Sequence, residues 1–87
     1  MGEARLSNLE QQTLSAWQDC EVETGFGFRR ISSLSGTPSH LVRRVTRALA
    51  RKGMVKYERA LVREDENHLG AGYVVTQQGW EFIRGRA

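Results

Sequence analysis

The fold is decided by the stretch from Ile31 to Met54, which reads ISSLSGTPSHLVRRVTRALARKGM. Its centre carries apolar residues at the three- and four-residue spacing of one helix face: Leu41, Val42, Val45, Ala48 and Leu49. Pro38 suits the first helical position because its missing N–H is not needed there, and Thr37 is placed to cap the helix. Gly53 suits the position just after a helix, where the backbone often adopts the left-handed conformation. We therefore predict a helix from Pro38 to Arg51.

Two shorter helices are predicted before this one. Ser7-Asn8-Leu9-Glu10 has the pattern of a capping box and predicts a helix that runs to about Cys20. Its expected buried face is Leu6, Leu9, Thr13, Trp17 and Cys20. After the break at Gly25-Phe26-Gly27, the spacing of Phe28, Ile31 and Leu34 predicts a second, short helix that Gly36 ends.

A β-hairpin and a last helix are predicted after Gly53. Met54 to Arg63 is rich in β-branched and aromatic residues, and Gly72-Tyr73-Val74-Val75 repeats that character beyond a polar loop from Glu64 to Gly70. Thr76 is placed to cap a short helix that carries Trp80, Phe82 and Ile83. The predicted fold is α+β and mostly helical, in the order helix, helix, helix, strand, strand, helix. Its 87 residues fit a single domain, residues 1–87.

This order resembles the winged helix-turn-helix domains of MarR-like regulators, over roughly Phe28 to Phe82. Ile31-Ser32-Ser33-Leu34-Ser35-Gly36 looks like the first helix of the motif and its turn. The recognition-helix ending "V…L…GxV" is matched by Val42, Leu49, Gly53, Met54 and Val55, and the "LTxxG" after the wing by Tyr73-Val74-Val75-Thr76-Gln77-Gln78-Gly79. The resemblance implies three helices, a two-stranded wing, a short last helix and DNA binding.

The chain departs from those regulators at three places. Thr37 stands where the turn often has an aliphatic residue, and the long terminal helices that dimerise MarR-like proteins are not found. The expected wing tip is acidic at Glu64, Asp65 and Glu66, which should repel phosphate.

The charges of the chain are separated along its length. The net charge is only +3, but the segment from Phe26 to Arg63 has ten basic residues against the single acid Glu58. They are Arg29, Arg30, Arg43, Arg44, Arg47, Arg51, Lys52, Lys56, Arg59 and Arg63. One strongly positive surface on a weakly charged body favours a polyanionic partner, although an ordinary solvated face is the alternative.

The predicted third helix supplies the main DNA-binding candidates. Opposite its apolar stripe lie Ser39, His40, Arg43, Arg44, Arg47 and Arg51. An α-helix fits the major groove, where Arg grips guanine with two hydrogen bonds, and the N-terminal half of the helix makes most base contacts. We therefore assign base and nearby phosphate contacts to Ser39, His40, Arg43, Arg44 and Arg47. Arg51 and Lys52 are expected only to stabilise the helix end.

Further contacts to the DNA backbone are expected outside this helix. Arg29 and Arg30 open the second helix, and Arg59 and Arg63 lie on the predicted wing strands. The expected function is sequence-specific binding of double-stranded DNA by a small, repressor-like transcriptional regulator. It would act as a homodimer, with Trp17 and Trp80 on the flanking helices free to pair. The alternatives are a protein–protein assembly module and, in third place, an RNA-binding protein.

No enzyme, cofactor or metal site is predicted. Cys20, His40 and His68 are too few and too scattered for a metal site, and Ser39 and His40 are neighbours that point in different directions. Gly70-Ala71-Gly72 opens no helix and is no phosphate loop. No small-molecule effector can be inferred. A polar N-terminus, a single cysteine and no apolar run of about 18 residues favour a cytoplasmic protein without a membrane partner.

Overall fold

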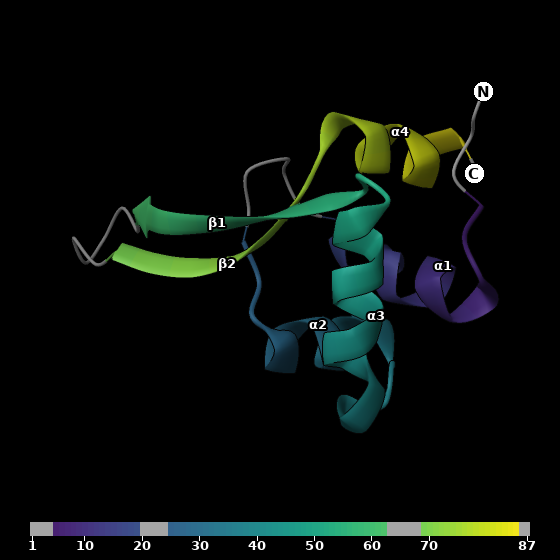
Figure 1. Ribbon diagram of the computed structural model, residues 1–87, viewed down its shortest axis with the longest axis horizontal. Coiled ribbons are helices and arrows are strands. Elements are labelled where there is room, and N and C mark those ends of the chain that lie inside the picture. Colours follow the sequence, from purple (N-terminus) through teal and green to yellow (C-terminus); the bar gives the residue numbers. More distant parts are fainter. Residues whose placement is uncertain (1–4, 20–24, 63–68, 86–87) are drawn as a thin grey trace.

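The computed structural model describes residues 5–19, 25–62 and 69–85. Over these ranges the chain has an α+β fold that is mostly helical, with four α-helices and a two-stranded antiparallel sheet. The elements are α1 (Asn8–Leu14), the 3-10 helix η1 (Ser15–Trp17), α2 (Phe28–Ser35), α3 (Ser39–Arg51), β1 (Val55–Val62), β2 (Leu69–Val75) and α4 (Gln77–Gly85). The helices form a body from which the hairpin projects to one side (Figure 1). The predicted order of elements is confirmed.

The first helix begins as predicted and ends early. The Glu10 N–H donates to Ser7 Oγ at 3.1 Å, and the Ser7 N–H donates to Glu10 Oε1 at 2.9 Å, which completes the capping box. The helix ends at Leu14 and tightens into η1, so the prediction of a helix to Cys20 was wrong. Such 3-10 turns are common at helix ends because they satisfy the last free carbonyl groups. Cys20 itself lies outside the described residues.

The buried side of this segment differs in part from the predicted one. Thr13 and Trp17 are buried as predicted, whereas Leu6 and Leu9 are only half-buried. Leu14, the last residue of α1, and Ala16 of η1 are buried instead. After Leu14 the tighter turn of η1 rotates the chain relative to a continuing α-helix.

The predicted buried face of α2 was wrong at Leu34. Ile31 is buried and Phe28 is half-buried, but Leu34 is 47% exposed. Each three-residue step in an α-helix falls about 60° short of a full turn. Leu34 therefore lies about 120° around the helix from Phe28 and leaves the buried side.

The helix ends at Gly36 and Gly53 are confirmed, and the start of α3 needs a correction. Gly36 and Gly53 have φ of 79° and 81°, the left-handed conformation that glycine adopts without strain. The helix α3 begins at Ser39, with Pro38 as an extended N-cap residue and no side-chain cap. Thr37 does not cap it, because its hydroxyl is buried against Thr13.

The second strand of the hairpin is longer than predicted, whereas β1 lies within its predicted range, and a third segment pairs with the hairpin. In the register, Val55 pairs with Val75 and Tyr57 with Tyr73, and β2 already begins at Leu69, which was predicted to be loop. The Phe26 N–H donates to the Tyr73 carbonyl at 2.9 Å, and the Tyr73 N–H donates back at 2.8 Å. This bridge, which was not predicted, fixes β2 to Phe26, two residues before α2.

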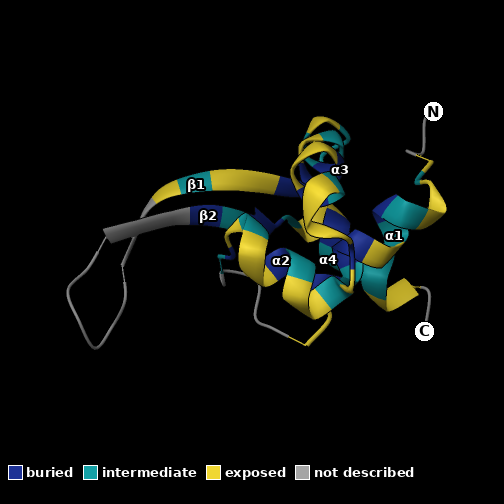
Figure 2. Ribbon diagram, turned by 90° about the horizontal axis from the view of Figure 1, so that it is seen from below, coloured by how far each residue is buried: buried dark blue, intermediate teal, exposed yellow. Residues whose placement is uncertain are grey.

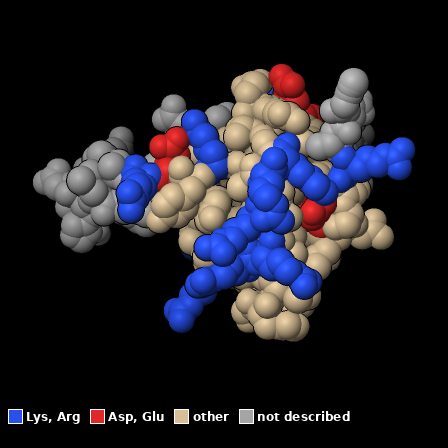
Figure 3. Space-filling view, viewed as in Figure 1, with Lys and Arg blue, Asp and Glu red and all other residues tan. Residues whose placement is uncertain are grey.

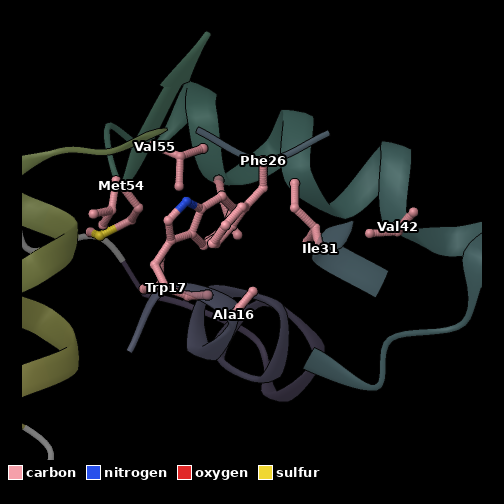
Figure 4. Packing of buried hydrophobic residues seen from close by; sticks show 10 residues of the cluster. Ala16, Trp17, Phe26, Ile31, Val42, Met54 and Val55 are labelled. Atoms are coloured by element: carbon pink, nitrogen blue, oxygen red, sulfur yellow. The ribbon is translucent and has the colours of Figure 1, made fainter. Parts of the chain in front are cut away.

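The core is centred on Trp17, which is completely buried (Figure 4). Its ring lies 5.7 Å from that of Phe26, and its indole N–H donates to the Tyr73 carbonyl at 3.3 Å. The other buried apolar members are Leu14, Ala16, Ile31, Val42, Leu49, Met54, Val55 and Val75. Since none of its surface is exposed, Trp17 is not free to pair with a second copy, contrary to the prediction.

The last helix packs closely on the start of the hairpin. The Gly79 N–H donates to Thr76 Oγ1 at 3.0 Å, which confirms the predicted cap. A Cβ at position 79 would collide with the Met54 carbonyl oxygen, so only glycine allows this approach. Trp80, Phe82 and Ile83 are half-buried against the core. Among the described residues, no helix combines the length and the apolarity needed to cross a membrane.

Candidate nucleic-acid interface

The two sides of α3 are chemically opposite. The residues that face the core are Val42, Val45, Thr46 and Leu49. The exposed residues are the six predicted ones: Ser39, His40, Arg43, Arg44, Arg47 and Arg51. Figure 2 shows the exposed residues on the outside of the helix, and Figure 3 shows Lys and Arg side chains gathered along α3. We call these six residues the α3 face.

The arginines of the α3 face point in different directions. At about 100° per residue, Arg44 and Arg47 lie near the direction opposite to the buried residues. Arg43 lies further round, on the side of α2, and its guanidinium carbon stands 5.1 Å from the centre of the Phe28 ring. The centre of the α3 face, with Arg44 and Arg47, therefore points away from the core, and its edge, with Arg43, contacts α2.

Hydrogen-bonded hydroxyl groups fix the turn that places α3. Thr37 Oγ1 and Thr13 Oγ1 are 2.7 Å apart and buried, and Thr13 Oγ1 donates to the Leu9 carbonyl at 2.8 Å. Ser35 Oγ lies 2.9 Å from Thr37 Oγ1, and Ser32 Oγ donates to the Thr37 carbonyl at 2.6 Å. Because buried hydroxyls are costly to leave unpaired, these bonds hold the turn against α1 and set where α3 begins.

Lys52 is turned away from the α3 face. Its Nζ lies 2.7 Å from Glu10 Oε1 and donates to the Arg5 carbonyl at 2.8 Å. Burial by itself would raise the pKa of Glu10, but the hydrogen bonds from Lys52 and Ser7 and the charges of Lys52 and Arg51 outweigh it, so this pKa is lowered. Lys52 was expected to stabilise the end of α3. The structure shows that it ties that end to α1.

A second lysine of the basic segment also has a partner. Lys56 Nζ on β1 lies 3.1 Å from Glu58 Oε2, so its charge is partly offset within the hairpin. The exposed cations of the α3 face have no ion-pair partner among the described acids. Among the described elements, α3 thus carries the largest group of exposed arginines without an ion-pair partner.

The start of α2 lies beside the start of α3. A shallow hollow between them is lined by Phe28, Arg29, Ser32, Ser33, Ser39 and Val42. Arg29 and Ser39, predicted separately, therefore line one surface. Arg30 is also exposed, and its guanidinium carbon lies 5.9 Å from the Phe26 ring centre. Arg59 is exposed on β1, whereas Arg63 and the acidic residues Glu64, Asp65 and Glu66 lie outside the described residues.

Sequence reasoning missed a row of aromatic rings that ends at Arg43. The Phe28 ring is 5.6 Å from the Tyr73 ring, and the Tyr73 ring is 5.1 Å from that of Tyr57. Tyr57 is 53% exposed, so the row reaches the surface of the hairpin. The four residues are far apart in the sequence, and no local spacing indicates that they meet.

The described part of the chain offers no group of three His, Cys, Asp or Glu residues that could hold a metal ion. His40 lies exposed on α3, and the two other residues considered for a metal site, Cys20 and His68, are outside the described residues.

The comparisons with known proteins concern the fold. No protein-family model matches the sequence, and no curated protein matches it. The chain is similar to the crystal structure of a protein from Ralstonia eutropha JMP134 named a "putative DNA-binding protein". The TM-score is 0.66 at 18% sequence identity, over 94% of this chain and 98% of that one. At this identity the similarity shows a shared fold over nearly the whole length of both proteins.

Proposed function

We propose that this protein is a winged helix-turn-helix protein that binds double-stranded DNA and places α3 in the major groove. In this proposal α2 and α3 are the helix-turn-helix, and β1 and β2 are the wing. The observation that carries it is the α3 face, which holds four arginines, a histidine and a serine, all exposed, and no acid. A helix of this kind fits the major groove, and its arginines match the guanine edge and the phosphates.

Two further observations support DNA as the partner. The structural neighbour from Ralstonia eutropha JMP134 is named for DNA binding. The turn before α3 is held by buried hydroxyl groups, so the helix is presented on a rigid support rather than on a loose loop. Preorganised contact groups lose less entropy when they bind.

The contacts divide by position. Ser39, His40, Arg43, Arg44 and Arg47 would contact base edges and adjacent phosphates, because the first half of a recognition helix enters the groove most deeply. Arg29 and Arg30 on α2, and Arg59 and Arg63 on the wing, would contact the backbone of the DNA. Such contacts position a protein without reading sequence.

We further propose that the protein is a transcriptional regulator of the repressor type rather than an enzyme. It would act in the cytoplasm as a homodimer that occupies two half-sites about one helical turn apart. The pairing surface would have to exclude the buried Trp17 and use other residues, such as Trp80 on α4, which is half-exposed.

Selection of bound duplexes from a random pool, followed by binding titrations over a range of salt, tests this proposal. If about four to six phosphates are neutralised per subunit, the logarithm of the binding constant should fall with the logarithm of salt at a slope of roughly −4 to −5 per subunit. Failure to bind duplexes at low salt, or binding indifferent to salt, would contradict the proposal and favour an assembly module. Light scattering on the complex tests the dimer, which a 1:1 complex with full affinity for one half-site would exclude.

A further inference from the structure

We propose that Phe28 is the positioning residue of Arg43: its ring holds the guanidinium group on the DNA-facing side of the molecule before DNA arrives. This inference rests on the proposed DNA binding and adds a residue that itself makes no base contact.

The geometry shows a fixed platform. The Arg43 guanidinium carbon is 5.1 Å from the centre of the Phe28 ring, within the range in which a cation is attracted to the face of an aromatic ring. Phe28 is half-buried and its ring contacts that of Tyr73 at 5.6 Å. Tyr73 is anchored in turn by its two backbone hydrogen bonds to Phe26. The platform is therefore supported from β2 and does not depend on α3 itself.

The contact with Phe28 leaves the hydrogen-bonding capacity of Arg43 available. A guanidinium group has five N–H donors, and the attraction of its charge to an aromatic ring does not occupy them as an ion pair would. Arg43 remains exposed and has no ion-pair partner among the described acids. Arg43 held against Phe28 can thus donate to guanine or phosphate while its long side chain is already ordered. The ordering cost that a free arginine incurs on binding is reduced.

The substitution Phe28→Leu tests this role, because leucine keeps an apolar side chain and removes the aromatic face. We expect it to weaken binding to the selected duplex by about three- to tenfold, the effect of ordering one long side chain. Phe28→Tyr, which keeps the ring, should bind as the wild type does. In an Arg43→Ala background, Phe28→Leu should have no further effect on binding, since the residue that it positions is absent.

The matched control is an arginine–aromatic pair in α4. The Arg84 guanidinium carbon lies 5.9 Å from the centre of the Trp80 ring, which makes an arginine–aromatic pair outside the proposed interface. Arg84→Ala, which removes this pair at an exposed residue, should leave the DNA affinity measured on a single half-site unchanged. Circular dichroism confirms that each variant is folded.

A readout without DNA keeps the inference independent of the proposed function. In the NMR spectrum of the free wild-type protein, the Arg43 side-chain protons should be shifted upfield by the Phe28 ring, and Phe28→Leu should abolish the shift. Unshifted Arg43 protons in the wild type overturn the inference even if Phe28→Leu does not fold. A protein that shows the shift but binds no DNA contradicts the proposed function instead.

Two outcomes of the binding measurements would also overturn the positioning role of Phe28. If Arg43→Ala weakens binding while Phe28→Leu does not, Arg43 needs no platform. If Phe28→Leu weakens binding equally with and without Arg43, Phe28 acts through the fold and not through Arg43.

Discussion

Lys52 Nζ lies 2.7 Å from Glu10 Oε1, so the end of α3 is bound to the first turn of α1. One and two helical turns earlier, the exposed guanidinium groups of Arg47 and Arg44 have no partner among the described acids. The basic segment thus contains cations with different tasks. Lys52 stabilises the fold, and the arginines of the α3 face remain available for a polyanion.

Replacing Lys52 and Arg44 by methionine should separate these tasks. Lys52→Met leaves Glu10 without its main partner and should lower the free energy of unfolding by about 1 kcal/mol, while the salt dependence of DNA binding stays the same. Arg44→Met should leave stability nearly unchanged and reduce the salt slope by about one, because one phosphate contact is lost. Urea unfolding and salt titrations measure the two effects. The reverse pattern would show that Lys52, not Arg44, faces the DNA.

The stability of the protein should fall in acid partly through Glu10. Burial opposes ionisation, but the hydrogen bonds from Lys52 and Ser7 lower the pKa of Glu10 below its ordinary value of 4.5. A carboxyl group with a lowered pKa stabilises the folded state above its unfolded pKa, and this contribution is lost as the pH falls through the folded pKa. Between about pH 5 and pH 3, the wild type should therefore lose more stability than Glu10→Gln. Parallel curves for the two proteins in urea unfolding would refute this role.

Two buried threonines should respond in opposite ways to the same substitution. Thr37 and Thr46 are 1% and 0% exposed, but Thr37 Oγ1 is hydrogen-bonded to Thr13 whereas Thr46 Oγ1 has no partner among the described residues. Thr37→Val should lower the free energy of unfolding by about 1–2 kcal/mol. Thr46→Val removes an unpaired buried hydroxyl from nearly the same volume and should raise it by about 1 kcal/mol.

Thermal and urea unfolding of the two variants check the signs. Each substitution is the control for the other, since both replace a buried threonine by valine. A loss of stability in both variants would show that Thr46 has a hydrogen bond in solution.

The elements with strong local signals could be predicted from the sequence. The apolar stripe of α3 faces the core because residues three and four apart share a helix side, and this alone placed the arginines outside. Gly36 and Gly53 end their helices in the left-handed conformation. The capping box at Ser7 and the cap at Thr76 depend only on residues up to three positions away.

The parts that depend on contacts between distant residues could not be predicted. The burial of Thr37 depends on its hydrogen bond to Thr13, and the backbone bridge at Phe26 depends on Tyr73. Arg43 meets Phe28 only because α2 packs across α3. Local spacing carries no information on such pairs, so the chemistry of the α3 face could be predicted, but neither the support of the turn nor the aromatic platform could.

The claim that the α3 face reads DNA is tested most directly by one comparison. The affinity of the Arg47→Ala protein is measured for the duplex selected by the wild type and for a duplex of scrambled sequence. The account predicts a loss of about 1–3 kcal/mol in binding to the selected duplex, with preference relaxed at one base pair and a smaller loss on scrambled DNA. Arg43→Ala should show the same pattern as Arg47→Ala. Arg84→Ala on α4 is the control, and it should change the affinity for neither the selected nor the scrambled duplex. Unchanged affinity and unchanged base preference in folded Arg47→Ala and Arg43→Ala proteins would contradict the account.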